Sequence, residues 1–107
     1  MADLAPAGGP AGKLVVKNIG LLLSGMLERP ILDADCVIAR DGKIEAVGKA
    51  KDLDLSGAKV TIDAKGTALA PGLIDSHVHP VFGDWTPRQS QLGWIDSFLH
   101  GGVTAMI

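Results

Sequence analysis

The sequence has little cysteine, few aromatic residues and no long hydrophobic run. The single cysteine, Cys36, cannot form an internal disulfide, which fits a reducing compartment. No segment approaches the roughly 18 uninterrupted apolar residues of a membrane span. The first residues also lack the basic start and apolar stretch of a secretory signal. These absences predict a cytoplasmic protein that neither crosses nor binds a membrane.

A strong charge of one sign is also missing. The chain has 12 acidic and 10 basic residues, a net charge of -2, two tryptophans, two phenylalanines and no tyrosine. Neither a basic footprint nor a base-stacking surface is present, which argues against a nucleic-acid partner. The 107 residues suffice for one domain at most. They cannot form a complete (β/α)₈ barrel, which needs about 200 residues or more.

The first part of the chain changes from small residues to a β-type pattern. Residues 1–12 would bury little apolar surface, so we expect a disordered tail. Residues 13–70 contain short branched or apolar runs between turn residues, which is typical of a small β-sandwich. Asp41-Gly42 supplies the positive φ angles of a two-residue hairpin turn. The predicted strands are residues 14–19, 21–23, 36–40, 43–47, 59–63 and 67–70, and residues 49–57 are predicted to form a loop or one helical turn.

The pattern changes again at Pro71-Gly72. Residues 73–79 and 103–107 are predicted as strands, and the second lacks alternation, as expected of a strand buried on both faces. A helix between them would make a βαβ unit with parallel strands and a right-handed crossover. The start and stop signals of that helix are Thr86 as N-cap, Pro87, Gln89 and Gly101-Gly102. The predicted fold class is therefore α/β with a β-rich N-terminal part.

Asp75, His77 and His79 alternate along the predicted strand of residues 73–79, so their side chains would share one face. Two such imidazoles can reach a common divalent ion at about 2.0 to 2.1 Å from each nitrogen. A carboxylate two residues earlier could orient the ring of the first histidine or help to stabilise the site. Alternatively, backbone carbonyls could satisfy both histidines. A position at the carboxyl end of a strand favours the metal, because ligand crevices of parallel α/β folds lie there.

Several segments resemble the amidohydrolase superfamily, the metal-dependent hydrolases related to dihydroorotases and imidazolonepropionases. The most specific is Pro-Gly-Leu-Ile-Asp-x-His-x-His, and the enamidases of that superfamily are the most similar group. The resemblance implies a β-sandwich built from both chain ends and a (β/α)₈ barrel whose first strand carries two metal ligands, His77 and His79. The superfamily segments are residues 41–48, 62–66, 70–79 and 101–104, and the enamidase-like ones are residues 17–20, 83–84, 87–89 and 99–102.

The same resemblance implies a reaction and a cofactor. A divalent metal, zinc first, with iron or a binuclear centre as alternatives, would activate water against a C–N bond of a cyclic amide. A bridging carboxylate or carboxylated lysine, two further histidines and a catalytic aspartate would lie beyond Ile107. Asp84 and Arg88 are candidates for substrate contact, with solvated loop and helix-start positions as the alternative. A homo-oligomeric full-length enzyme is also implied.

Our leading hypothesis is therefore the N-terminal portion of a cyclic-amide hydrolase, with residues 13–70 in the β-sandwich domain and residues 71–107 at the start of the barrel. The alternative is a non-catalytic, truncated β-rich module without firm metal binding. Because two histidines half-fill a tetrahedral site, we expect the isolated chain to be inactive and to bind zinc weakly. Cys36 is predicted to be a small buried hydrophobe, and His100 a structural residue complementing the dipole of its helix.

Overall fold

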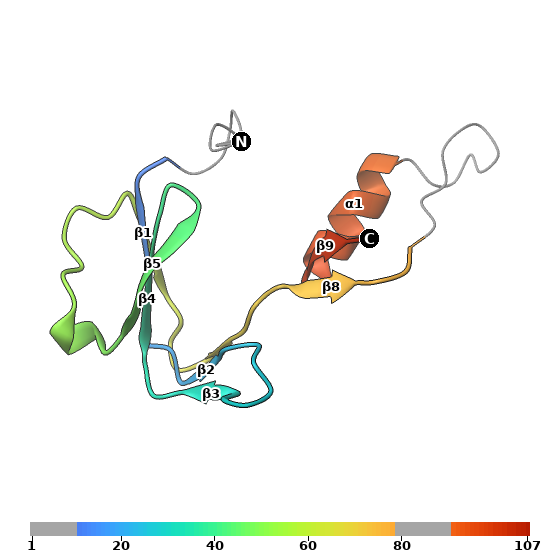
Figure 1. The fold of residues 1–107 in the computed structure, drawn as a ribbon. Coiled ribbons are helices and arrows are strands. Elements are labelled where there is room, and N and C mark those ends of the chain that lie inside the picture. The colour runs from blue at the N-terminus through green and yellow to red at the C-terminus, as the bar shows by residue number, and fades with distance from the viewer. Residues whose placement is uncertain (1–10, 79–90) are drawn as a thin grey trace. The chain divides into compact units, whose positions relative to one another are not determined.

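The computed structural model describes residues 11–78 and 91–107, and Figure 1 shows the elements. The chain divides into two compact units, one ending at Ala70 and the other beginning at Pro71. In the first unit the elements are β1 (Lys13–Lys17), β2 (Leu21–Leu23), β3 (Ile31–Leu32), β4 (Cys36–Arg40), β5 (Lys43–Gly48), the 3-10 helix η1 (Ala50–Asp52), β6 (Val60–Asp63) and β7 (Ala68–Leu69). In the second unit they are β8 (Leu73–Asp75), α1 (Gln91–His100) and β9 (Val103–Met106).

The β4–β5 hairpin forms as predicted. Its turn residues, Asp41 and Gly42, have φ angles of 51° and 82°, the positive values that a type I′ turn requires. The Asp41 carboxylate also accepts a hydrogen bond from the backbone N–H of Gly12 at 2.6 Å. This contact ties the hairpin to the residue before β1. A bulge after Ile38 was not foreseen; it interrupts the regular pairing of β4 with β5.

Two sheets make up the described part of the first unit, and the chain passes between them three times, after β1, after β3 and after β6. The strand orders are β5-β4-β1-β6 and β3-β2-β7. Because β1 pairs in parallel with β6, and β2 in parallel with β7, the crossing from β1 to β2 and the crossing from β6 to β7 run side by side. The predicted turn near Lys65 and Gly66 therefore leads from one sheet to the other. The strand β3, which has two residues, was not predicted.

These two crossings are in close contact at Gly20. Its N–H donates to the carbonyl oxygen of Thr67 at 2.9 Å, and the N–H of Gly66 donates to the carbonyl oxygen of Asn18 at 2.7 Å. A Cβ atom added to Gly20 would lie 2.0 Å from the carbonyl oxygen of Gly66. Because that oxygen belongs to the backbone, only a shift of one crossing could make room. The absence of a side chain at Gly20 therefore allows the two crossings between the sheets to lie in contact.

The core of the first unit lies on one face of the four-stranded sheet. Val15 and Cys36 are fully buried there, together with Ile38, and Leu53 and Leu55 pack against them. The prediction of Cys36 as a buried small hydrophobe is confirmed, and its burial raises the pKa of the thiol. The core is small, so single contacts within it count heavily in the stability of the unit.

The opposite face of the same sheet is apolar as well, and it is only partly covered. Residues paired across a ladder share a face, so the register places eight apolar side chains together on this side. Among them are exposed Ile44, Val47, Val60 and Ile62 and half-buried Leu14, Val16, Val37 and Ala39. Contiguous exposed apolar surfaces of this kind mark interaction sites.

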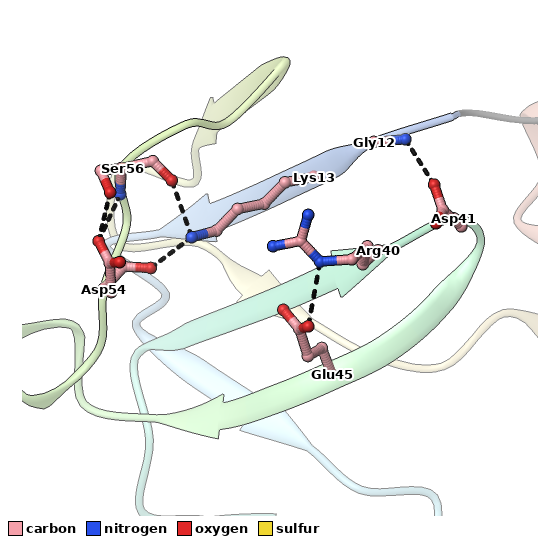
Figure 2. A network of polar contacts seen from close by, with 7 residues as sticks. All are labelled: Gly12, Lys13, Arg40, Asp41, Glu45, Asp54 and Ser56. Carbon is pink, nitrogen blue, oxygen red and sulfur yellow. Dashed lines mark hydrogen bonds and ion pairs between the residues drawn. The ribbon is translucent and has the colours of Figure 1, made fainter.

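Lys13 is charged and yet only 7% exposed. Figure 2 shows its ammonium group between two backbone carbonyl groups, donating to the oxygen of Asp54 at 2.5 Å and to that of Ser56 at 2.9 Å. Hydrogen bonds of this kind compensate for the cost of removing the ammonium group from water. The Ser56 hydroxyl and backbone N–H, helped by the charge of Lys13, hold the pKa of Asp54 below its usual value. Lys13 thus fastens the segment after η1 to β1.

We expect the stability of the protein to fall in acid, because three exposed aspartates have lowered pKa values. Lys49 lowers the pKa of Asp33 through an ion pair of 2.9 Å, and the Asn18 amide lowers that of Asp63 through a hydrogen bond; Asp54 is the third. The folded-state pKa of each group is below the usual 3.8, so its charged form stabilises the fold. This stabilisation is fully present above pH 3.8 and is lost as the pH falls through the folded-state pKa.

The contribution of these aspartates to the free energy of unfolding, measured with urea, should therefore be constant between about pH 7 and pH 5. It should decline below about pH 4. The Asp63→Asn variant, whose side chain cannot titrate, should show a shallower decline. A free energy of unfolding that rises on acidification from pH 5 to pH 2.5 would contradict this assignment.

The second unit contains the predicted parallel strand pair. β8 pairs in parallel with β9, and Figure 1 shows α1, which contacts β9, leading into it. The predicted helix end is also confirmed, because Gly102 has a φ of 90° and its N–H donates to the carbonyl oxygen of Leu99 at 3.0 Å. The predicted helix-start residues, Thr86 and Pro87, lie outside the described residues.

The prediction that residues 103–107 are buried on both faces is wrong for this structure. Val103 is half-buried, whereas Ile107 is 83% exposed, and the neighbouring strand leaves Leu73 and Ile74 60% and 67% exposed. Within the described residues of this unit, one helix packs against a sheet of two strands. Such a small assembly cannot cover both faces of its sheet.

Candidate functional site

The candidate metal-binding segment begins where β8 ends. The strand stops at Asp75, and Ser76 and His77 form a bend. The prediction that the strand continues through His77 is therefore wrong. The cause is local: Oδ1 of Asp75 accepts a hydrogen bond from the backbone N–H of His77 at 3.1 Å. A side chain that bonds to the backbone two residues ahead turns the chain out of the extended conformation.

This turn changes how the candidate ligands can be arranged. Asp75 is half-buried and His77 is exposed, and strand alternation no longer places their side chains on one face. The carboxylate accepts a hydrogen bond from the backbone N–H of His77, and its predicted role in orienting the imidazole ring stays a prediction. The sequence did not predict this turn, because an aspartate at this position is compatible both with a continuing strand and with a turn closed by its side chain.

Three of the predicted site residues, His79, Asp84 and Arg88, lie outside the described residues. In the described ranges, 11–78 and 91–107, no group of three or more His, Cys, Asp or Glu side chains could hold a metal ion. His77 nevertheless offers an imidazole nitrogen and Asp75 a carboxylate, which are donor types that zinc accepts. The described residues thus fit part of a metal site, and the pairing of two histidines stays a prediction.

The sheet gives this segment a defined place. The carbonyl oxygen of Asp75 accepts a hydrogen bond from the N–H of Ile107 at 3.0 Å, and Asp75 pairs with Met106 in the parallel ladder. His77 therefore follows the carboxyl end of a strand in a parallel pair. Ligands of open parallel α/β sheets bind outside this end of the strands, so the location agrees with a binding role.

The remaining residues considered from the sequence lie elsewhere in the chain. His100 lies in the last turn of α1, as predicted, and is the last residue of that helix; its structural role stays a prediction. Cys36 belongs to the core of the first unit. In the part of the chain that the structure describes, neither helix has the length and apolar character needed to cross a membrane.

Comparison with known proteins shows which proteins the chain is similar to. No family model matches the chain. Its sequence is 45% identical to enamidase from Eubacterium barkeri over 95 residues, which make up 89% of this chain and 25% of that enzyme. The solved structure of an enamidase, described as a new member of the amidohydrolase superfamily, matches with a TM-score of 0.75 over the same shares of the two chains. This chain is homologous to the amidohydrolase superfamily.

Two further relatives agree with this assignment. Imidazolonepropionase from Paenarthrobacter aurescens is 33% identical over 90 residues, which are 83% of this chain and 22% of that protein. L-hydantoinase from Arthrobacter aurescens matches with a TM-score of 0.51 at 35% identity, over 66% of this chain and 14% of that one. The chain thus spans about a quarter or less of the length of these relatives. The resemblance seen in the sequence is confirmed.

Proposed function

We propose that this chain is the N-terminal portion of a metal-dependent amidohydrolase that cleaves a C–N bond of a cyclic amide. The match to enamidase carries the proposal, because sequence and structure agree over 89% of the chain at 45% identity. The proposal includes residues 13–70 as part of a β-sandwich domain and residues 71–107 as the start of a (β/α)₈ barrel. A cytoplasmic location and a homo-oligomeric full-length enzyme belong to it as well.

His77 and His79 would hold the metal, most suitably zinc, because imidazole nitrogens are ligands that this ion prefers. When bound, such an ion polarises a substrate carbonyl and acidifies a water molecule. The chain itself presents His77 beyond the carboxyl end of β8, in a turn closed by Asp75. Asp84 and Arg88 follow in sequence and are proposed to contact the substrate.

The uncovered apolar surfaces support a larger protein around this chain. One face of the four-stranded sheet and both strands of the second unit expose large aliphatic side chains, among them Ile44, Ile62 and Ile74, which are 72%, 48% and 67% exposed. Soluble monomers seldom leave such surfaces open to water. Further polypeptide of a full-length enzyme would cover them.

The test compares two proteins, the isolated chain and the product of the whole reading frame that contains it. Each is purified and incubated with a cyclic amide, and ring opening and bound metal are measured. We expect turnover and bound divalent metal only in the longer protein, because two histidines leave a tetrahedral ion half-coordinated.

Turnover by the isolated chain would show that the site is complete within it and would overturn the proposal of a partial site. If the full product neither binds metal nor opens cyclic amides, the chain is instead the non-catalytic β-rich module that the sequence left as the alternative.

A further inference from the structure

One type of turn recurs at three aspartates of this chain. In each, Oδ1 accepts a hydrogen bond from the backbone N–H two residues ahead: Asp54 from Ser56 and Asp63 from Lys65, both at 2.9 Å, and Asp75 from His77 at 3.1 Å. Asp63 and Asp75 are also the last residues of β6 and β8. The same side-chain contact thus accompanies the end of two strands that lie in different units.

We propose that Asp75 is a positioning residue for His77, and that it acts through this backbone hydrogen bond and not through its charge. The inference rests on the proposed role of His77 as a metal ligand. The contact is made to the main chain of His77, so it sets the direction in which that residue leaves the strand. Without it, residues 76 and 77 could remain extended, and the His77 imidazole would be presented from a different backbone conformation.

The sequence alone suggested another role for Asp75, in which the carboxylate orients the imidazole ring. The two roles require different chemistry. A carboxylate that orients or polarises an imidazole depends on its negative charge, whereas closing the turn needs only an oxygen acceptor. Asparagine keeps that oxygen at the same place and loses the charge, so substitution by asparagine separates the two roles.

The experiment uses the full chain with Asp75→Asn, Asp75→Ala and a matched control, Asp63→Ala, which removes the equivalent turn at the end of β6. Hydrogen exchange of the His77 amide is followed by NMR, and the affinity for zinc alone by competition with a chromophoric chelator. Asp75→Ala should speed exchange about tenfold and weaken zinc binding about tenfold. Asp75→Asn should leave both within about twofold, and Asp63→Ala should change neither.

If Asp75→Asn is as damaging as Asp75→Ala, the charge is required and the proposal is wrong. If Asp75→Ala leaves the exchange of the His77 amide unchanged, the hydrogen bond does not hold the turn, and the proposal is again wrong. If the unmodified chain binds no zinc even at millimolar concentration, the proposed metal role of His77 loses its support in this chain, while the exchange measurement still decides whether Asp75 positions the backbone.

Discussion

Replacing Gly20 with alanine is expected to lower the free energy of unfolding by about 3 kcal/mol, the upper part of the range for overpacked sites. The new Cβ atom would lie 2.0 Å from the carbonyl oxygen of Gly66. That oxygen cannot rotate away as a side chain could, so the two crossings between the sheets must separate. The hydrogen bond from the Gly20 N–H to Thr67 would be strained at the same time. Thermal unfolding followed by circular dichroism should show a midpoint roughly 10 °C lower or more.

Gly48 provides the matched control for this substitution. A Cβ atom added there would lie 3.8 Å from the nearest atom of Leu53, which is an ordinary packing distance. Gly48→Ala should therefore unfold within about 3 °C of the unmodified protein, a shift of less than 1 kcal/mol. Equal midpoints of thermal unfolding for the two variants would show that the contact between the two crossings at Gly20 is looser than the structure indicates.

The local turns of the fold could be predicted because their causes lie in a few neighbouring residues. Asp41-Gly42 and Gly101-Gly102 are read correctly from the sequence, since the positive φ angles of Gly42 and Gly102 follow from the low cost of that conformation for glycine. The same reasoning cannot find the parallel pairing of β1 with β6, because no local signal specifies a partner more than 40 residues away. It also misses the burial of Lys13, which depends on carbonyl groups of a distant loop.

The candidate site shows a different limit. Alternation at Asp75, His77 and His79 predicts a continuous strand, and nothing in that period reveals that the first side chain will bond to the backbone of the second. The side chain of a polar residue at a strand end can follow the alternation of the strand, or it can bond to the backbone and close a turn. The sequence pattern is the same in both cases. The family resemblance was nevertheless correct, because it depends on the identity of residues 70–79 and not on their local conformation.

Burial was the least predictable property of the second unit. The apolar, branched composition of residues 103–107 is that of a buried strand, yet burial requires something to pack against. The described part of this unit supplies one helix and one neighbouring strand. The composition is therefore suited to a more fully covered strand than the described residues provide, in line with the proposal of a larger enzyme.

Replacing both His77 and His79 with alanine in the full product of the reading frame is expected to remove its metal and its activity. Loss of one supporting partner of a metal ligand typically costs about 10- to 100-fold in affinity, so loss of two direct ligands should cost more than about 100-fold. Metal content, measured by mass spectrometry after dialysis, should fall with the rate of ring opening of a cyclic amide. Circular dichroism should remain unchanged, since His77 is exposed.

His100→Ala is the control for the double variant, because it removes the chain's third histidine. That histidine is exposed at the end of α1, where it is expected to complement the helix dipole only. This variant should keep its metal and its activity. If instead the double variant retains full metal content and turnover, His77 and His79 are not ligands. The location of the site at the carboxyl end of β8 would then have to be abandoned, although the homology to the superfamily would stand.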